Sequence, residues 1–439
     1  MEDAPLPSRT IRRVGVITAL AALAFGAIAP ASVASAADRT KPPVVGFPLD
    51  VTFYGRGWGH GVGMSQHGAR GRALAGQAAP EILAHYFAGT ALGSIDPATP
   101  VRVLLLDALA AKAGAPLTAH GRGGDWSIEG LAKTFPANAK LTAAPVSAGS
   151  TNWNLSVVSS AGAKLLAMTV SGGFTMLPGS ASTTLQLDSK PSSYDTYRGR
   201  LRVKLTTTAR VINDIGLDAY LRGVVPIEMP SSWPAEALRA QSIAARSYAV
   251  YRLHPGSGSF DLYDDTRSQV YRGAEGEKAT TDTAIVDTAG KILKSGSSVA
   301  NAMFHSTGGG ATENNEFVFV SATGKIVSSP VSYLRGSPDR AADGTAYDAG
   351  APYATWQTGT YTKAEIDAIF NADSRTAAGS SLKLDLSRRG VSGRLISVTL
   401  TGTLGSKTVS GDVFRAVFNA NRPDGAEMRS TLVDTRPIP

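Results

Sequence analysis

Apolar and polar positions follow two different patterns along this chain of 439 residues. Residues 95–199 consist of short runs rich in apolar and β-branched residues, separated by turns of Gly, Ser and Ala; such runs occur at 101–106, 153–158 and 184–187. This pattern predicts a β-rich insert or subdomain. The alternation that follows over residues 200–215 predicts a hairpin.

Helical periodicity marks much of the rest of the chain, where the expected helices are 64–75, 80–87, 234–252, 362–370 and 411–418. Pro80 suits the first turn of its helix, and Thr362 with Glu365 forms a capping box. Further strands are expected at 51–54, 382–386 and 395–401. Helices and strands mixed in this way predict an α+β fold.

The helix predicted over residues 234–252 carries polar residues on an otherwise small and apolar surface. Arg239, Ser242 and Arg246 are spaced i, i+3 and i+7, so they share one face. The alanines elsewhere on the helix allow close packing. We expect the polar face to line a groove.

The N-terminus has the pattern of a secretory signal over residues 1–36. Arg9, Arg12 and Arg13 precede an apolar stretch over 14–29, and Ala-Ser-Ala ends at residue 36. The mature chain is therefore expected to be exported, with no stable membrane span after cleavage. A retained N-terminal anchor is the alternative. The Pro-rich residues 37–50 are expected to act as a tether.

Composition narrows the class of partner. The chain has no cysteine, so disulfides cannot stabilise it outside the cell. Its formal net charge of +8 suits an anionic partner such as a cell-wall polymer. Because the Lys and Arg residues are scattered and not interleaved with aromatic residues, nucleic acid is not an expected partner.

Glu228 is the strongest candidate for chemistry. It follows an apolar run, expected to be a strand, and precedes the helix over 234–252. Apolar surroundings raise the pKa of a glutamate, which then can donate a proton to a leaving oxygen and later take one back. The alternative is that Glu228 only caps the following helix through its dipole. A second candidate is the loop over 55–63, in which five of nine residues are glycine, allowing close backbone approach to a ligand.

Three separated motifs resemble the SpoIID/LytB family. The first is Tyr-Leu-Arg-Gly-Val-Val-Pro-x-Glu-Met-Pro at 220–230, continued by Trp-Pro-x-Glu-Ala-Leu-x-Ala-Gln-Ser-x-Ala-Ala-Arg-Ser-Tyr at 233–248. The others are Gly-His-Gly-Val-Gly-Met-Ser-Gln at 59–66 and Phe-His-Ser-x-Gly-Gly at 304–309. The resemblance implies a SpoIID-like core formed by residues 51–94 and 200–439, interrupted by the β-rich residues 95–199.

The order of these motifs departs from the common family arrangement. In many members the Gly-His-Gly motif follows the Arg-Ser-Thr strand, which is 429–431 here, whereas in this chain it lies near the N-terminus. If the fold is kept, the order is permuted and the two ends of the mature chain lie close together.

The resemblance implies an exported lytic transglycosylase that cleaves the β-1,4 bond between N-acetylmuramic acid and N-acetylglucosamine in stem-free peptidoglycan strands, leaving 1,6-anhydro ends. Glu228 would be its single catalytic acid and base. The residues implied in substrate binding are Arg246, Tyr248, His60, Gln66, Gln269, His305 and Ser306.

No metal or cofactor is expected. His60, His67 and His305 lie far apart in sequence, and some relatives bind a metal partly through cysteines, which this chain lacks. A second function stays open, in which the same groove binds cell-wall glycan without cutting it and the protein enhances an N-acetylmuramoyl-L-alanine amidase.

Overall fold

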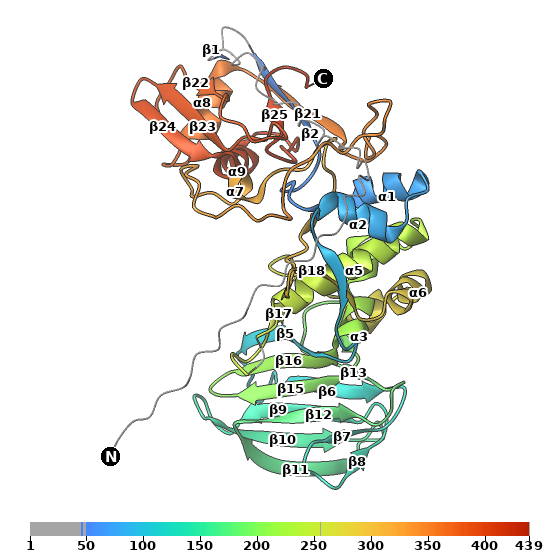
Figure 1. Cartoon of the computed structure of the whole chain (residues 1–439). Coiled ribbons are helices and arrows are strands. Elements are labelled where there is room, and N and C mark those ends of the chain that lie inside the picture. Colours follow the sequence, from blue (N-terminus) through green and yellow to red (C-terminus); the bar gives the residue numbers. More distant parts are fainter. Residues whose placement is uncertain (1–44, 47–49, 255, 439) are drawn as a thin grey trace, which may run out of the picture. The chain divides into compact units, whose positions relative to one another are not determined.

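The computed structural model describes residues 45–46, 50–254 and 256–438. The predicted signal over 1–36 lies outside these residues. Helices and several sheets occur together, which confirms the α+β class (Figure 1). Within the described residues, no helix combines the length and the apolar character needed to cross a membrane.

Two large, mainly antiparallel sheets dominate the β-rich region. The six-stranded sheet has the order β11 (Lys164–Ser171), β10 (Asn152–Val158), β9 (Lys140–Pro145), β6 (Leu117–Arg122), β13 (Thr184–Gln186) and β14 (Thr196–Tyr197). The seven-stranded sheet has the order β17 (Leu262–Tyr263), β5 (Pro100–Leu109), β16 (Ala209–Gly216), β15 (Arg200–Leu205), β12 (Gly173–Pro178), β7 (Trp126–Ile128) and β8 (Thr134–Phe135), with β17 parallel to β5.

Both sheets bury alternate residues in one common core, which includes the fully buried Trp126 and Trp153. The boundary expected between residues 199 and 200 falls inside the seven-stranded sheet. β12 pairs with β15, and β5 pairs with β16, so the predicted hairpin over 200–215 is confirmed but belongs to the β-rich region. The strands of that region and the chain leading to Glu228 therefore fold as one unit.

The central helix is α5 (Ala235–Tyr251), which confirms the prediction for 234–252. Its small residues allow close packing in two hydrophobic cores. Ala240 and Ala244 pack with α1 (Gln66–Leu74) and α2 (Ala79–Tyr86). Ala245 and Ala249 pack in the core of the β-rich region. The other elements near it are α3 (Leu217–Arg222), α6 (Ala279–Asp287), the 3-10 helix η1 (Gly273–Gly276) and the sheet of β4 (Ala91–Ser94), β18 (Lys291–Ser295) and β19 (Ser298–Val299).

The strand expected before Glu228 is wrong. The segment forms α3 and then α4 (Val225–Glu228), a single turn with Pro226 in its first positions. Pro226 has a fixed φ that suits a helix start, and the buried Val224 and Val225 fill the core from helical positions. Glu228 is consequently the last residue of a short helix.

The C-terminal third forms a second region around Phe53, Phe370, Phe414 and Phe418. One sheet has the strand order β1 (Val45–Gly46), β22 (Lys383–Asp385), β23 (Ser397–Gly402) and β24 (Gly405–Ser410). A second sheet has the order β21 (Thr355–Tyr361), β2 (Val51–Arg56) and β25 (Val433–Asp434). The helices of this region are α7 (Asn315–Val318), α8 (Lys363–Asn371) and α9 (Gly411–Asn421). The predicted capping box of Thr362 and Glu365 opens α8.

Strand β2 pairs with β25, so segments from opposite ends of the chain lie side by side (Figure 1). Tyr54 faces Asp434, and Gly55 faces Val433. Segments close to the two ends are therefore neighbours among the described residues, as the permuted motif order requires. Residues 45–46, expected in a tether, pair with β22.

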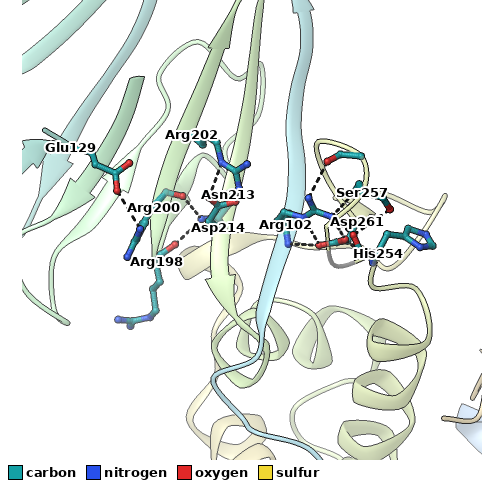
Figure 2. A network of polar contacts seen from close by, with 11 residues as sticks. Arg102, Glu129, Arg198, Arg200, Arg202, Asn213, Asp214, His254, Ser257 and Asp261 are labelled. Atoms are coloured by element: carbon teal, nitrogen blue, oxygen red, sulfur yellow. Dashed lines mark hydrogen bonds and ion pairs between the residues drawn. The ribbon is translucent and has the colours of Figure 1, made fainter. Parts of the chain in front are cut away.

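Arg102 on β5 fastens the loop that follows α5, as Figure 2 shows. Its guanidinium donates to both carboxylate oxygens of Asp261, over 2.9 and 2.6 Å, and to the carbonyls of His254 and Ser257. A bidentate, charge-assisted pair of this kind holds a loop firmly. The loop leads directly through β17 into residues 264–270, which reach Glu228.

Candidate active site

The three motifs meet at one place in the structure. β3 (Met64–Ser65) runs parallel to β20 (Phe304–His305), which joins the second motif to the third. The side-chain amide of Gln66 donates to the backbone carbonyl of Glu228 over 2.9 Å, which joins the second motif to the first. The Gly-His-Gly loop thus lies against Glu228, as expected.

A cavity of about 430 Å³ opens where the motifs meet, a volume in the usual range of ligand pockets. Its lining consists of Trp58, Gly59, His60, Gln66, Glu228, Tyr248, Thr266, Ser268, Val270, Met303, Phe304, His305 and Ser306. One carboxyl group, that of Glu228, stands among polar, aromatic and aliphatic side chains.

The carboxyl of Glu228 is held at the end of α4. Its Oε1 accepts a hydrogen bond from the Val270 N–H over 3.2 Å. Burial raises the pKa of Glu228 above the ordinary 4.5, and the hydrogen bonds from Val270 and Gln66 oppose this rise without cancelling it. A raised pKa keeps a larger fraction of the carboxyl protonated, so Glu228 is suited to donate a proton.

The two histidines of the cavity, His60 and His305, are both hydrogen-bonded to the backbone of Val62. Its N–H donates to His60 Nδ1 over 3.0 Å, and its carbonyl accepts from His305 Nδ1 over 3.2 Å. Since a carbonyl only accepts and an amide N–H only donates, the neutral His60 carries its proton on Nε2 and the neutral His305 on Nδ1. Burial lowers the pKa of both rings, that of His60 to about 4, with Arg394 as a further cause.

Nε2 of the buried His305 has no hydrogen-bond partner within the described residues. In the neutral tautomer this nitrogen is an acceptor. His305 lines the cavity, but this nitrogen has almost no exposed surface, so a ligand hydroxyl reaches it only if neighbouring side chains move.

Arg394 packs against the backbone of the glycine-rich loop at Gly61. Gly61 adopts a φ of +85°, and a Cβ there would lie 2.4 Å from the Arg394 guanidinium. The buried guanidinium donates to the carbonyls of Gly308 over 2.8 Å and Ala311 over 3.1 Å. Only glycine at position 61 allows this approach, which couples the second and third motifs.

Tyr248 forms another wall of the cavity. Its hydroxyl donates to the Ser268 carbonyl over 3.2 Å, and the Arg252 guanidinium lies 3.4 Å from the ring centroid. Arg252 is itself held by Asn301 over 2.9 Å. The hydroxyl end and one face of the phenol ring are therefore fixed, and the ring gives the cavity a rigid aromatic wall.

Six of the eight residues expected in the site line the cavity: Glu228, Tyr248, His60, Gln66, His305 and Ser306. Gln269 does not. Its buried side chain accepts from the Tyr220 hydroxyl and donates to the Ala245 carbonyl, each over 3.3 Å, which fixes the backbone next to Val270.

Arg246 does not line the cavity either. Its side chain is fully buried, pairs with Asp218 over 2.6 Å, and donates to the carbonyls of Lys291 and Ile285. The polar face of α5 therefore packs against α3, α6 and β18, and the expected groove along that face is wrong. Arg246 joins the elements around the site and contacts no cavity surface.

Sequence reasoning missed several lining residues, above all Trp58, Thr266, Ser268 and Val270. Trp58 lies inside the glycine-rich loop, and an aromatic residue among glycines was a usable signal. Val270 donates a hydrogen bond to Glu228 from its backbone N–H, and a backbone donor cannot be recognised from the residue type. No group of three or more His, Cys, Asp or Glu in the described part of the chain is placed to hold a metal ion.

Comparison with known proteins places this site in context. A family model described as stage II sporulation protein, SpoIID, matches residues 206–294. The chain is 34% identical over 170 residues to stage II sporulation protein D of Bacillus subtilis, covering 35% of this chain and 47% of that protein. It is 38% identical over 119 residues to the amidase enhancer of Bacillus subtilis, covering 27% of this chain and 15% of that protein.

A third relative, an uncharacterized protein of Brachyspira hyodysenteriae, is 34% identical over 125 residues, or 28% of this chain and 34% of that protein. The chain thus spans less than half the length of each of these relatives. The matched region contains Glu228 and α5, and the other two motifs close the cavity around it. These features define a SpoIID-type domain. The chain as a whole shows similarity to SpoIID and amidase-enhancer proteins over part of its length.

Proposed function

We propose that this protein is an exported lytic transglycosylase that cleaves peptidoglycan glycan strands with Glu228 as its single acid and base. The observation that carries the proposal is the Glu228 carboxyl, whose pKa is raised by burial, in a cavity lined by all three family motifs. The net charge of +8 suits an anionic cell-wall polymer.

The reaction needs one proton carrier and no water. Protonated Glu228 gives its proton to the bridging oxygen, and the bond from that oxygen to C1 of N-acetylmuramic acid breaks with both electrons leaving on the oxygen. The C6 hydroxyl of the same sugar attacks C1, and the Glu228 carboxylate takes the hydroxyl proton. A 1,6-anhydro ring forms, and Glu228 ends protonated as it began. Because the nucleophile belongs to the substrate, a second carboxylate is not required.

The neighbouring groups suit this chemistry. The Val270 N–H holds one oxygen of Glu228 in place, so the carboxyl keeps its orientation through both proton transfers. The fixed ring of Tyr248 provides a surface for a sugar face. Both cavity histidines are neutral near pH 7, because burial lowers the pKa of each.

The experiment that tests this function uses stem-free glycan strands digested in water enriched in ¹⁸O. Mass spectrometry should find 1,6-anhydro ends, each lighter by one water than a reducing end, without ¹⁸O. Products that carry ¹⁸O at new reducing ends would identify a hydrolase and overturn the proposed mechanism.

A second candidate function rests on the similarity to the amidase enhancer of Bacillus subtilis. In that case the cavity binds glycan and the protein increases the activity of an N-acetylmuramoyl-L-alanine amidase. The two functions differ in their dependence on the carboxyl. Enhancement of amidase activity should survive Glu228→Gln, whereas formation of anhydro ends should not.

Export is part of the proposal. We expect the signal over residues 1–36 to be removed, leaving the protein in the cell wall or the extracytoplasmic space. N-terminal sequencing of the protein recovered from the culture medium and wall fraction should begin at residue 37. An intact N-terminus in the membrane fraction would show a retained anchor instead.

A further inference from the structure

Two exposed aromatic side chains lie in contact at the edge of the cavity. Trp58, which lines the cavity, is 44% exposed, and Tyr353 is 37% exposed. Their ring centroids are 5.2 Å apart with an angle of 82° between the planes. A single exposed aromatic residue is ordinary, but a contiguous pair that continues a cavity indicates a binding surface.

The backbone of Tyr353 is held in an unfavourable conformation. Its φ is +62°, in the left-handed region that non-glycine residues rarely adopt. The Tyr353 carbonyl accepts from the Gly57 N–H over 2.9 Å, so the glycine-rich loop itself holds the residue there. Such strain is retained mainly where the surrounding structure imposes it, and it is concentrated at functional sites.

Arg429 braces the pair from a third segment. Its guanidinium lies 4.5 Å from the Tyr353 ring centroid and 5.6 Å from that of Trp58. Its carbonyl accepts from the Gly59 N–H over 3.2 Å, and its side chain pairs with Glu427 over 2.7 Å. The rings are therefore fixed before any ligand arrives, which lowers the entropic cost of binding.

We propose that Trp58 and Tyr353 form a sugar-binding subsite that continues the Glu228 cavity and receives a further pyranose ring of the β-1,4-linked glycan. The proposal rests on the glycan function proposed above. A pyranose has an apolar face of C–H groups and a polar edge of hydroxyl and acetamido groups. Because the two ring planes are 82° apart, one ring can lie against the face while the other contacts the edge, where the Arg429–Glu427 pair offers donors and acceptors.

The position of the pair favours a glycan over a protein partner. Trp58 belongs to the cavity lining, so a chain bound at Glu228 passes directly onto the ring pair. Glu427 pairs with Arg429 over 2.7 Å and with Arg422 over 3.3 Å, so it balances part of the Arg429 charge beside the rings. A protein that docks on these rings is the competing occupant.

Binding should be measured with Glu228→Gln protein, which retains the cavity but not the chemistry. Calorimetric titration with β-1,4-linked N-acetylglucosamine oligomers, from disaccharide to hexasaccharide, should show affinity that rises with length. Tyr353→Ala and Trp58→Ala, each added to Glu228→Gln, should weaken the hexasaccharide by roughly fivefold to tenfold and leave the rise with length much reduced. Tyr353→Phe should keep the rise.

Phe260→Ala is the matched control. Phe260 forms a T-shaped pair with Tyr263, at 5.1 Å and 70°, beside Arg210, but neither ring lines the cavity. Tyr353→Gly, which removes both the ring and the backbone strain, covers the case in which Tyr353→Ala does not fold. Equal affinity in the ring variants, an equal loss in Phe260→Ala, or no binding at any length would overturn the subsite.

The outcome also separates this proposal from the proposed function. If wild-type protein forms anhydro ends but the ring variants bind every oligomer unchanged, the subsite is wrong and the function stands. If binding depends on the rings and no anhydro ends form, the subsite stands and the function is wrong. Loss of capture of a protein partner in the ring variants, with glycan affinity unchanged, would assign the surface to that partner.

Discussion

The Gln66 side-chain amide donates a 2.9 Å hydrogen bond to the backbone carbonyl of Glu228, 162 residues further along the chain. Gln66 is the first residue of α1, directly after the strand that pairs with β20. The last residue of α4 has no helical partner for its carbonyl, and Gln66 supplies one. The position of the candidate catalytic residue therefore depends on the glycine-rich loop, which explains why the motifs form one site in a permuted order.

Gly63→Ala tests this dependence. Gly63 has a φ of +71°, and a Cβ there would lie 2.2 Å from the Met303 carbonyl oxygen, a backbone atom that cannot move aside. We expect a loss of about 2–5 kcal/mol in the free energy of unfolding. Urea denaturation measures it. Gly76→Ala is the control, because Gly76 has a φ of +87° but nothing within 4 Å, and should cost only about 1–2 kcal/mol. Equal losses in the two variants would show that the packing at Gly63 contributes nothing.

Arg246→Ala tests whether Arg246 is structural. Removing a fully buried guanidinium leaves Asp218 without its ion-pair partner, so the free energy of unfolding should fall by about 3–5 kcal/mol. Arg239→Ala is matched to it, since Arg239 lies on the same helix in a more exposed pair with Asp287, and should cost about 0–1 kcal/mol. Both are measured by urea denaturation. A stable Arg246→Ala protein with weakened glycan binding would restore the substrate-binding role expected from sequence.

The pH dependence of stability tests the environment of Glu228. Burial raises the pKa of Glu228 in the folded state, so its contribution to stability is complete below the unfolded-state pKa and is lost as pH rises through the folded-state pKa. Glu228→Gln removes this loss. Melting temperatures of the two proteins should coincide in acid and diverge toward neutral pH, with Glu228→Gln the more stable. A less stable glutamine variant near pH 7 would favour the helix-capping role for the carboxylate.

Much of the fold could be predicted from local pattern. The helix α5 is long and rich in small residues, and α8 opens with a capping box, so both were found. The segment before Glu228 was misread because Val224 and Val225 suggest a strand, while their burial against the β-rich region makes them part of a helical turn. Tertiary packing overrode local preference there.

The parts of the site formed by side chains could be predicted from the sequence, whereas the parts formed by the backbone or by packing between distant segments could not. Periodicity placed Arg246 on a polar face, but only the fold shows that α6 and β18 cover that face. The contribution of Val270 is a backbone N–H, and that of Tyr353 depends on a chain approach between distant segments. Neither contribution can be recognised from the sequence alone.

The most direct test of the central claim compares wild-type and Glu228→Gln protein on stem-free glycan strands, with mass spectrometry of the released fragments. We predict 1,6-anhydro ends from the wild type and a rate lower by about 10²–10⁴-fold in the variant, since general acid catalysis contributes that much. Glycan binding should be unchanged. Anhydro ends released at the wild-type rate by Glu228→Gln, or none released by either protein, would contradict the assignment of Glu228 as the catalytic acid and base.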